Sequence, residues 1–163
     1  MKLTAKMRSI VTDLTYINVQ GKWHYICTLL DLSTRKIVSH SVGIHKNASL
    51  VMTAISQLPM NLSSIDIFHS DRGKEFDNQL IDDCLTTFGI KRSLSKKGCP
   101  YDNAVAEATF KSIKTEFVKG EKFTSLEHLQ ARFDQYVNWF NYIRLHSSLD
   151  YQTPMEFQNQ QTL

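Results

Sequence analysis

The sequence predicts an α/β fold: a five-stranded mixed sheet, in which an antiparallel meander is followed by parallel strands, flanked by helices. Val, Ile, Thr and aromatic residues dominate positions 10–44, short apolar runs alternate with helical patterns in the middle, and helical patterns fill the last third. At 163 residues and 42% hydrophobic content, the chain can bury one sizeable core. We expect a single domain over 1–163, with 144–163 as its C-terminal extension.

The meander is expected at the start of the chain. β-branched and aromatic residues favour strands at 10–19, 23–31 and 36–44. The connections at 20–22 and 32–35 are short turns, so consecutive strands should run antiparallel.

A βαβ unit should follow the meander. Pro59 and Gly89 are typical helix stops, and Asn and Ser are favoured helix caps. The expected elements are a helix from Asn47 or Ser49 to Leu58, a strand at 65–69, a helix from Asn78 to Phe88 and a strand at 90–95.

The last third is predicted to be helical. Positions 104–119 contain no helix breaker before Gly120, and 124–127 form a capping box for a second helix. A short capped helix is expected from Thr153, with 158–163 frayed. The order βββαβαβαα is that of an RNase H-like mixed sheet.

Composition narrows the functional classes only in part. A net charge of +3 is compatible with a nucleic-acid partner but is too small to indicate one alone. The three cysteines form no C-x-x-C pair, so neither a disulfide framework nor a zinc site is indicated. No apolar run approaches the roughly 18 residues of a membrane span. We therefore expect a cytoplasmic protein without a membrane partner.

Three acidic residues are candidates for chemistry, and each has an ordinary structural alternative. Asp13 interrupts a strand, where it could instead lie on a solvated edge. Asp71 follows an apolar strand, at the end where α/β proteins build their sites, but could merely start a turn. Glu107 lies between small alanines near a helix start, where the helix dipole alone favours an acid.

Together, Asp13, Asp71 and Glu107 fit the ligand preference of Mg²⁺ or Mn²⁺, since hard divalent ions choose oxygen ligands. Two such ions, about 4 Å apart, can assist both the attacking and the leaving oxygen of a phosphoryl transfer. Two metal ions per site are therefore expected.

Three segments resemble insertion-sequence transposases with a retroviral-integrase-like core. They are Val11–Ile17 (V-T-D-L-T-Y-I), His69–Gly73 (H-S-D-R-G) and Tyr101–Glu107 (Y-D-N-A-V-A-E). The 35 residues between Asp71 and Glu107 match the spacing for which the DD35E group is named. The segment Asn141–Leu149 (N-Y-I-R-L-H-S-S-L) resembles the same family.

The resemblance implies a polynucleotidyl transferase in which Asp13, Asp71 and Glu107 are the catalytic metal ligands. Water would free a 3′-hydroxyl at the transposon end, and that hydroxyl would attack target DNA, with no covalent protein intermediate. Family members recognise their transposon ends through a helix-turn-helix region, and we expect this chain to act as a homo-oligomer on DNA. No counterpart of that region precedes Met1, so we expect it to be supplied elsewhere, with the protein associated with the nucleoid.

Several other polar residues are expected to contact DNA. Lys111 and Lys114 share the helix face of Glu107, although an i, i+4 pair of Glu107 with Lys111 and the ordinary exposure of lysines on a helix surface would also explain them. Asn103 matches a family position near the scissile DNA, but could be a helix cap. Asp31, Glu75 and Asp77 are assigned to turns, and His69 to packing or to the site. The remaining candidate phosphate contacts, which could also form a solvated basic loop, are Arg92, Lys96 and Lys97.

Two other functions remain open at this point. An RNase H-like nuclease would hydrolyse nucleic acid without joining it, and a remnant of a decayed element would bind nucleic acid without catalysis. The spacing of Asp71 and Glu107 favours the transposase over the nuclease, and retention of all three acids favours it over the remnant.

Overall fold

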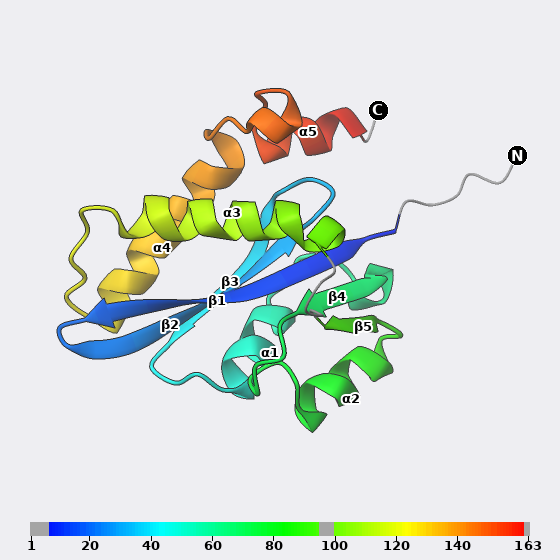
Figure 1. Ribbon diagram of the computed structural model, residues 1–163, viewed down its shortest axis with the longest axis horizontal. Helices are drawn as coiled ribbons and strands as arrows, with labels where there is room; N and C mark the ends of the chain where they lie inside the picture. The colour runs from blue at the N-terminus through cyan, green and yellow to red at the C-terminus, as the bar shows by residue number, and fades with distance from the viewer. Residues whose placement is uncertain (1–6, 95–99, 162–163) are drawn as a thin grey trace, which may run out of the picture.

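The computed structural model describes residues 7–94 and 100–161 and contains the predicted five-stranded mixed sheet (Figure 1). Its strand order is β3-β2-β1-β4-β5, in which β1, β2 and β3 are antiparallel neighbours and β4 and β5 run parallel to β1. The strands are β1 (Ser9–Val19), β2 (Lys22–Asp31), β3 (Ile37–Gly43), β4 (Ile67–Ser70) and β5 (Lys91–Leu94).

Helices cover both faces of the sheet, α1 and α2 on one side and α3 and α4 on the other (Figure 1). None of the helices that the structure describes is long and apolar enough to cross a membrane. The helices are α1 (Ala48–Ser56), η1 (Leu62–Ser64), α2 (Gln79–Thr87), α3 (Pro100–Val118), α4 (Leu126–Tyr142), η2 (Ser147–Leu149) and α5 (Pro154–Gln161).

Alternation along β1 divides the core into two layers. Ile10 and Leu14 are buried against α1 and α2, whereas Val11 and Ile17 are buried against α3 and α4. Successive side chains of a strand point to opposite faces, so one central strand supplies both layers. Asp13 lies two residues after Val11, so its side chain is on the same face of the sheet, the one that α3 covers.

The helix caps follow the sequence with one correction. Asn47 and Asn78 cap α1 and α2 as predicted, each accepting a hydrogen bond from a first-turn N–H. The cap of α4 is Ser125 rather than Thr124, because Ser125 Oγ accepts from His128 N at 3.0 Å. The Thr124 N–H donates to His128 Nδ1 at 3.1 Å. The helix therefore begins one residue later than predicted.

The ends of the last helices also differ from the prediction. Helix α3 begins at Pro100 rather than at position 104, consistent with the tolerance of a first helical turn for proline. Glu107 therefore lies beyond the first turn, which weakens the helix dipole as an explanation for an acid there. Helix α5 has the expected Thr153–Glu156 capping box and continues to Gln161, so positions 158–161 are helical rather than frayed.

Candidate active site

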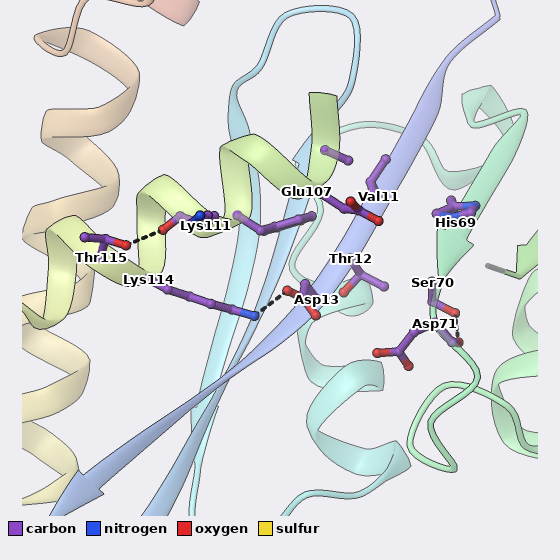
Figure 2. A pocket seen from close by; sticks show the side chains of 12 residues that line it. Val11, Thr12, Asp13, His69, Ser70, Asp71, Glu107, Lys111, Lys114 and Thr115 are labelled. Carbon is purple, nitrogen blue, oxygen red and sulfur yellow. Dashed lines mark hydrogen bonds and ion pairs between the residues drawn. The ribbon is translucent and has the colours of Figure 1, made fainter. Parts of the chain in front are cut away.

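A cavity of about 410 Å³ opens where β1, the end of β4 and α3 meet (Figure 2). Its wall includes all three acids singled out in the sequence, although they come from elements far apart in the chain. The charged residues that line it are Asp13, Asp71, Glu107, Lys111 and Lys114.

The pairing of β1 with β4 brings two of the acids to the same cavity. The strands are parallel, with Val11 opposite His69. Two residues further along the chain from this last pair come Asp13 and Asp71, the first residue after β4, and both line the cavity. Asp71 Oδ1 also accepts a hydrogen bond from Gly73 N at 2.7 Å, so the turn role that the sequence left open is present as well.

Helix α3 brings the third acid and the lysines to the cavity. Ala106 and Phe110 are buried against the sheet, and the small Ala106 side chain lets the helix lie close to it. Glu107 is exposed beside them, and Figure 2 shows it among the side chains that line the cavity. The same helix face carries Lys111 and, one turn on, Lys114.

Lys114 forms the closest charge contact of the cavity. Its Nζ donates to Asp13 Oδ2 at 2.7 Å, with the lysine side chain 41% exposed and the aspartate 27% exposed (Figure 2). Lys111 is exposed, and within the described ranges no ion pair joins it to Glu107. The i, i+4 pairing considered for Lys111 is thus not formed in the structure.

A second cavity, of about 450 Å³, shares several lining residues with the first. It shares Asp13, Asp71 and Lys114 and adds Glu75, whose residue is only 6% exposed. The sequence assigns Glu75 to a turn, and in the structure Glu75 lies in the loop between β4 and α2. Nothing in its local sequence signals burial beside the aspartates.

The other residues considered in the sequence have different surroundings, and some lie outside the described part of the chain. Arg92 lies in β5 with its side chain 17% exposed and its guanidinium paired with Asp82, so its charge is engaged within the protein. His69 lines the cavity, and its Nδ1 lies 2.8 Å from Ser93 Oγ. Lys96, Lys97 and the side chain of Asn103 fall outside the described residues. Asp31 holds its turn as expected, because its Oδ1 accepts from Ser33 N at 2.9 Å.

The segment Asn141–Leu149, called the C-terminal motif below, is linked to α3 by hydrogen bonds from Arg144. Asn141 is buried and Arg144 donates to both Glu116 oxygens, with Nε to Oε1 at 2.9 Å. Tyr136 Oη donates to Glu116 Oε2 at 2.7 Å. Burial raises the pKa of Glu116, but the hydrogen bonds from Arg144 and Tyr136 outweigh it and lower that pKa overall. The ionised Glu116 therefore holds α3 to α4 and the segment after it.

The donor set fits a hard divalent cation in its chemistry. Asp13, Asp71 and Glu107 offer carboxylate oxygens on one cavity wall, which Mg²⁺ and Mn²⁺ prefer. As arranged here, no three acidic, His or Cys groups among the described residues lie close enough together to hold an ion. One oxygen of Asp13 is occupied by Lys114 and one of Asp71 by a backbone N–H.

Solved structures define the fold class. The catalytic core domain of BIV integrase superimposes with a TM-score of 0.70 at 18% identity, over 94% of this chain and 96% of that one. The HTLV-2 integrase catalytic core domain, solved in complex with magnesium, gives a TM-score of 0.64 at 16% identity over 91% and 94%. The predicted RNase H-like fold is confirmed.

Sequence comparison defines the family. The integrase core domain family matches residues 4–100, and a second integrase core domain family matches 107–162. This chain belongs to the integrase core domain family. It is 31% identical over 160 residues to the transposase for insertion sequence element IS904 of Lactococcus lactis. It is also 32% identical over 155 residues to the transposase InsF for insertion sequence IS3fB of Escherichia coli.

These alignments cover 96% and 91% of this chain but 63% and 52% of the two transposases. The chain thus spans between half and two thirds of their length. The resemblance to insertion-sequence transposases that the sequence indicated is confirmed.

Proposed function

We propose that this chain is the catalytic core of an insertion-sequence transposase, which cleaves DNA at the 3′ ends of its element and transfers them to a target. The observation that carries the proposal is the convergence of Asp13, Asp71 and Glu107 on one cavity lined by two lysines. Family membership and the transposase relatives support it.

Asp13, Asp71 and Glu107 would hold the divalent ions, Mg²⁺ or Mn²⁺, two per site. When bound, such ions lower the pKa of water and stabilise charge on phosphoryl oxygens. Lys111 and Lys114, on the same helix face, would bind phosphate oxygens and orient the DNA backbone across the carboxylates. Magnesium in the HTLV-2 integrase core structure supports the same choice of metal.

Two phosphoryl transfers are expected at this site. In the first, water attacks the phosphodiester at the element's end, and the bond from phosphorus to the 3′-oxygen breaks to leave a free 3′-hydroxyl. In the second, that hydroxyl attacks a target phosphorus, and the target 3′-oxygen leaves.

No protein nucleophile is required for either step. Burial raises the pKa of the Cys27 thiol to about 12, so this residue stays protonated and cannot attack phosphorus. Ser70 is buried, and its hydroxyl donates to the carbonyl oxygen of Asp71 at 2.9 Å. Both residues therefore serve packing and loop geometry.

The partners follow from the same proposal. Transposon-end and target DNA would be bound by a homo-oligomer of this chain. The dimeric and trimeric forms in which the HTLV-2 integrase core was solved support oligomerisation. DNA as the substrate would place the protein in the cytoplasm, at the nucleoid. Light scattering with and without end DNA measures the oligomer.

The deciding experiment is a strand-transfer assay in Mn²⁺ with a pre-cleaved duplex carrying the terminal repeat that flanks the gene. A transposase core yields joined product. Cleavage of uncut ends without joining would indicate the RNase H-like nuclease, and DNA binding without either reaction would indicate a catalytically inactive remnant.

A further inference from the structure

Glu75 is a buried carboxylate beside the active-site cavity that the proposed chemistry does not use. Its residue is 6% exposed, in the loop between β4 and α2. Its backbone carbonyl accepts from Asn78 Nδ2 at 3.0 Å, but its carboxylate makes no hydrogen bond or ion pair with any described residue. These oxygens are not among the fully buried, unpartnered side-chain atoms of the described residues, so the carboxylate is accessible from the cavity that it lines, where a cation can pair with it.

The Asp71 loop holds this carboxylate in place. Gly73 N donates to Asp71 Oδ1 at 2.7 Å, and a Cβ at Gly73 would overlap the Glu75 carboxylate. The absence of a side chain at Gly73 therefore leaves the space that the Glu75 carboxylate fills. Asp71 and Glu75 belong to one loop, and their carboxylates line one cavity.

A cation, Lys114, lines that cavity together with Glu75. The cavity of about 450 Å³ is lined by Asp13, Glu75 and Lys114, and in the structure the Lys114 ammonium is bound to Asp13. Lys46 also interacts with Glu75, because a hydrogen bond to Tyr16 and, to a lesser extent, the charge of Glu75 raise the pKa of Lys46. Its Nζ lies 5.0 Å from the centre of the Tyr16 ring, however, and Lys46 does not line this cavity. Lys114 is thus the cation that shares the cavity wall with Glu75.

The proposed function makes two demands on Asp13 that conflict. A divalent ion bound to Asp13 competes with Lys114 for the same carboxylate, one oxygen of which already accepts from the ammonium, and an ammonium beside that ion is repelled by it. We infer that Glu75 is a second ion-pair partner for Lys114: the Lys114 ammonium moves from Asp13 to Glu75 when the metal binds. Glu75 is then a positioning residue that sets metal affinity through Lys114. This inference rests on the proposed function, because it takes Asp13 as a metal ligand.

A double-mutant cycle on the full chain tests the inference through the Mn²⁺ dissociation constant, measured by calorimetry without DNA. Lys114→Met should tighten Mn²⁺ binding about fivefold, because a partly exposed ion pair no longer competes for Asp13. Glu75→Gln should weaken binding by about the same factor, because Lys114 then stays on Asp13. In the Lys114→Met background, Glu75→Gln should change nothing.

Equal weakening by Glu75→Gln in both backgrounds would overturn the inference, since Glu75 would then act on the ion by its own charge. No weakening in either background would overturn it too. Asp77→Asn, which removes an exposed acid two residues away, controls for general loss of charge. Thermal melts should show no loss of stability in Glu75→Gln, and Lys114→Met tests the competition without altering the loop.

Asp13→Asn separates this inference from the proposed function. If Asp13→Asn keeps the full Mn²⁺ affinity, Asp13 is not a ligand and the proposed function fails. If it loses that affinity while the Glu75 and Lys114 effects are independent, only the role of Glu75 fails.

Discussion

Asn141 recognises both backbone groups of Ile37, across 104 positions of sequence. Its Oδ1 accepts from Ile37 N at 2.9 Å, and its Nδ2 donates to Ile37 O at 2.9 Å. Ile37 begins β3, an edge strand of the sheet, so the amide completes pairing that the edge would otherwise lack. The asparagine of the C-terminal motif is thereby a structural link between α4 and the sheet.

Replacing Asn141 with Ala should therefore destabilise the protein by about 2 to 4 kcal/mol, because a buried N–H and a buried carbonyl lose their partners. For a domain of this size that corresponds to a decrease in Tm of roughly 5 to 10 °C. Asn138→Ala, on an exposed position of the same helix, should change Tm little. Equal Tm values for the two variants would contradict the structural role of Asn141.

Acid sensitivity is predicted at His146. Burial, together with the charge of Arg144, lowers the pKa of His146 to about 4, well below the unfolded value near 6.5. Between these values the unfolded chain binds a proton that the folded chain does not. Stability should therefore fall as pH decreases from about 6.5 to 4, by on the order of 2 kcal/mol.

Urea unfolding of the wild type and His146→Gln at several pH values measures this effect. The variant should have a flatter dependence of unfolding free energy on pH in that window. His45→Gln, at an exposed position, serves as the control and should keep the wild-type slope. The same slope in His146→Gln and the wild type would exclude His146 as the source.

The active-site assignment predicts a separation of catalysis from folding. Asp71→Asn keeps an oxygen that can accept from Gly73 N, and Glu107 is exposed, so neither Asp71→Asn nor Glu107→Gln should unfold the protein. Each change removes a metal-binding charge, so cleavage and joining should fall at least about a thousandfold, equivalent to about 4 kcal/mol of barrier. Activity is measured on labelled end DNA, with Asp77→Asn as control. Wild-type rates in either variant would refute the assignment.

The sequence predicted the sheet well because its signals are local. Alternation in β1 fixes which side chains enter each layer, and Asn47 and Asn78 cap their helices by contacts within three residues. The start of α3 was misplaced because Asp102 and Asn103 are good cap residues, although Pro100 is also tolerated in a first turn.

The charge contacts of the site were less predictable because they depend on tertiary distance. Lys114 pairs with Asp13, 101 positions away, rather than with a residue on its own helix. The burial of Glu75 arises from the path of its loop against Gly73, which no periodicity records. Spacing and family resemblance predict the three acids as a set, and the fold shows that Lys114 pairs with Asp13.

The last prediction concerns DNA binding by Lys111 and Lys114. Both line the cavity on the face of α3 that carries Glu107, where cations attract phosphates without reading sequence. Replacing both with Ala should weaken end binding and reduce the slope of log affinity against log salt by up to about 1.8, at roughly 0.9 per phosphate contact. Lys114 is paired with Asp13 in the structure and with Glu75 in the inferred metal-bound state, so its share of the slope should be smaller than that of Lys111 in both Mn²⁺ and a chelator. Fluorescence anisotropy across a salt series measures the slope, and Lys22→Ala, at an exposed position that does not line the cavity, is the control. A double variant with the wild-type slope in both conditions would make these lysines ordinary surface residues and shift the search for phosphate contacts to Lys96 and Lys97.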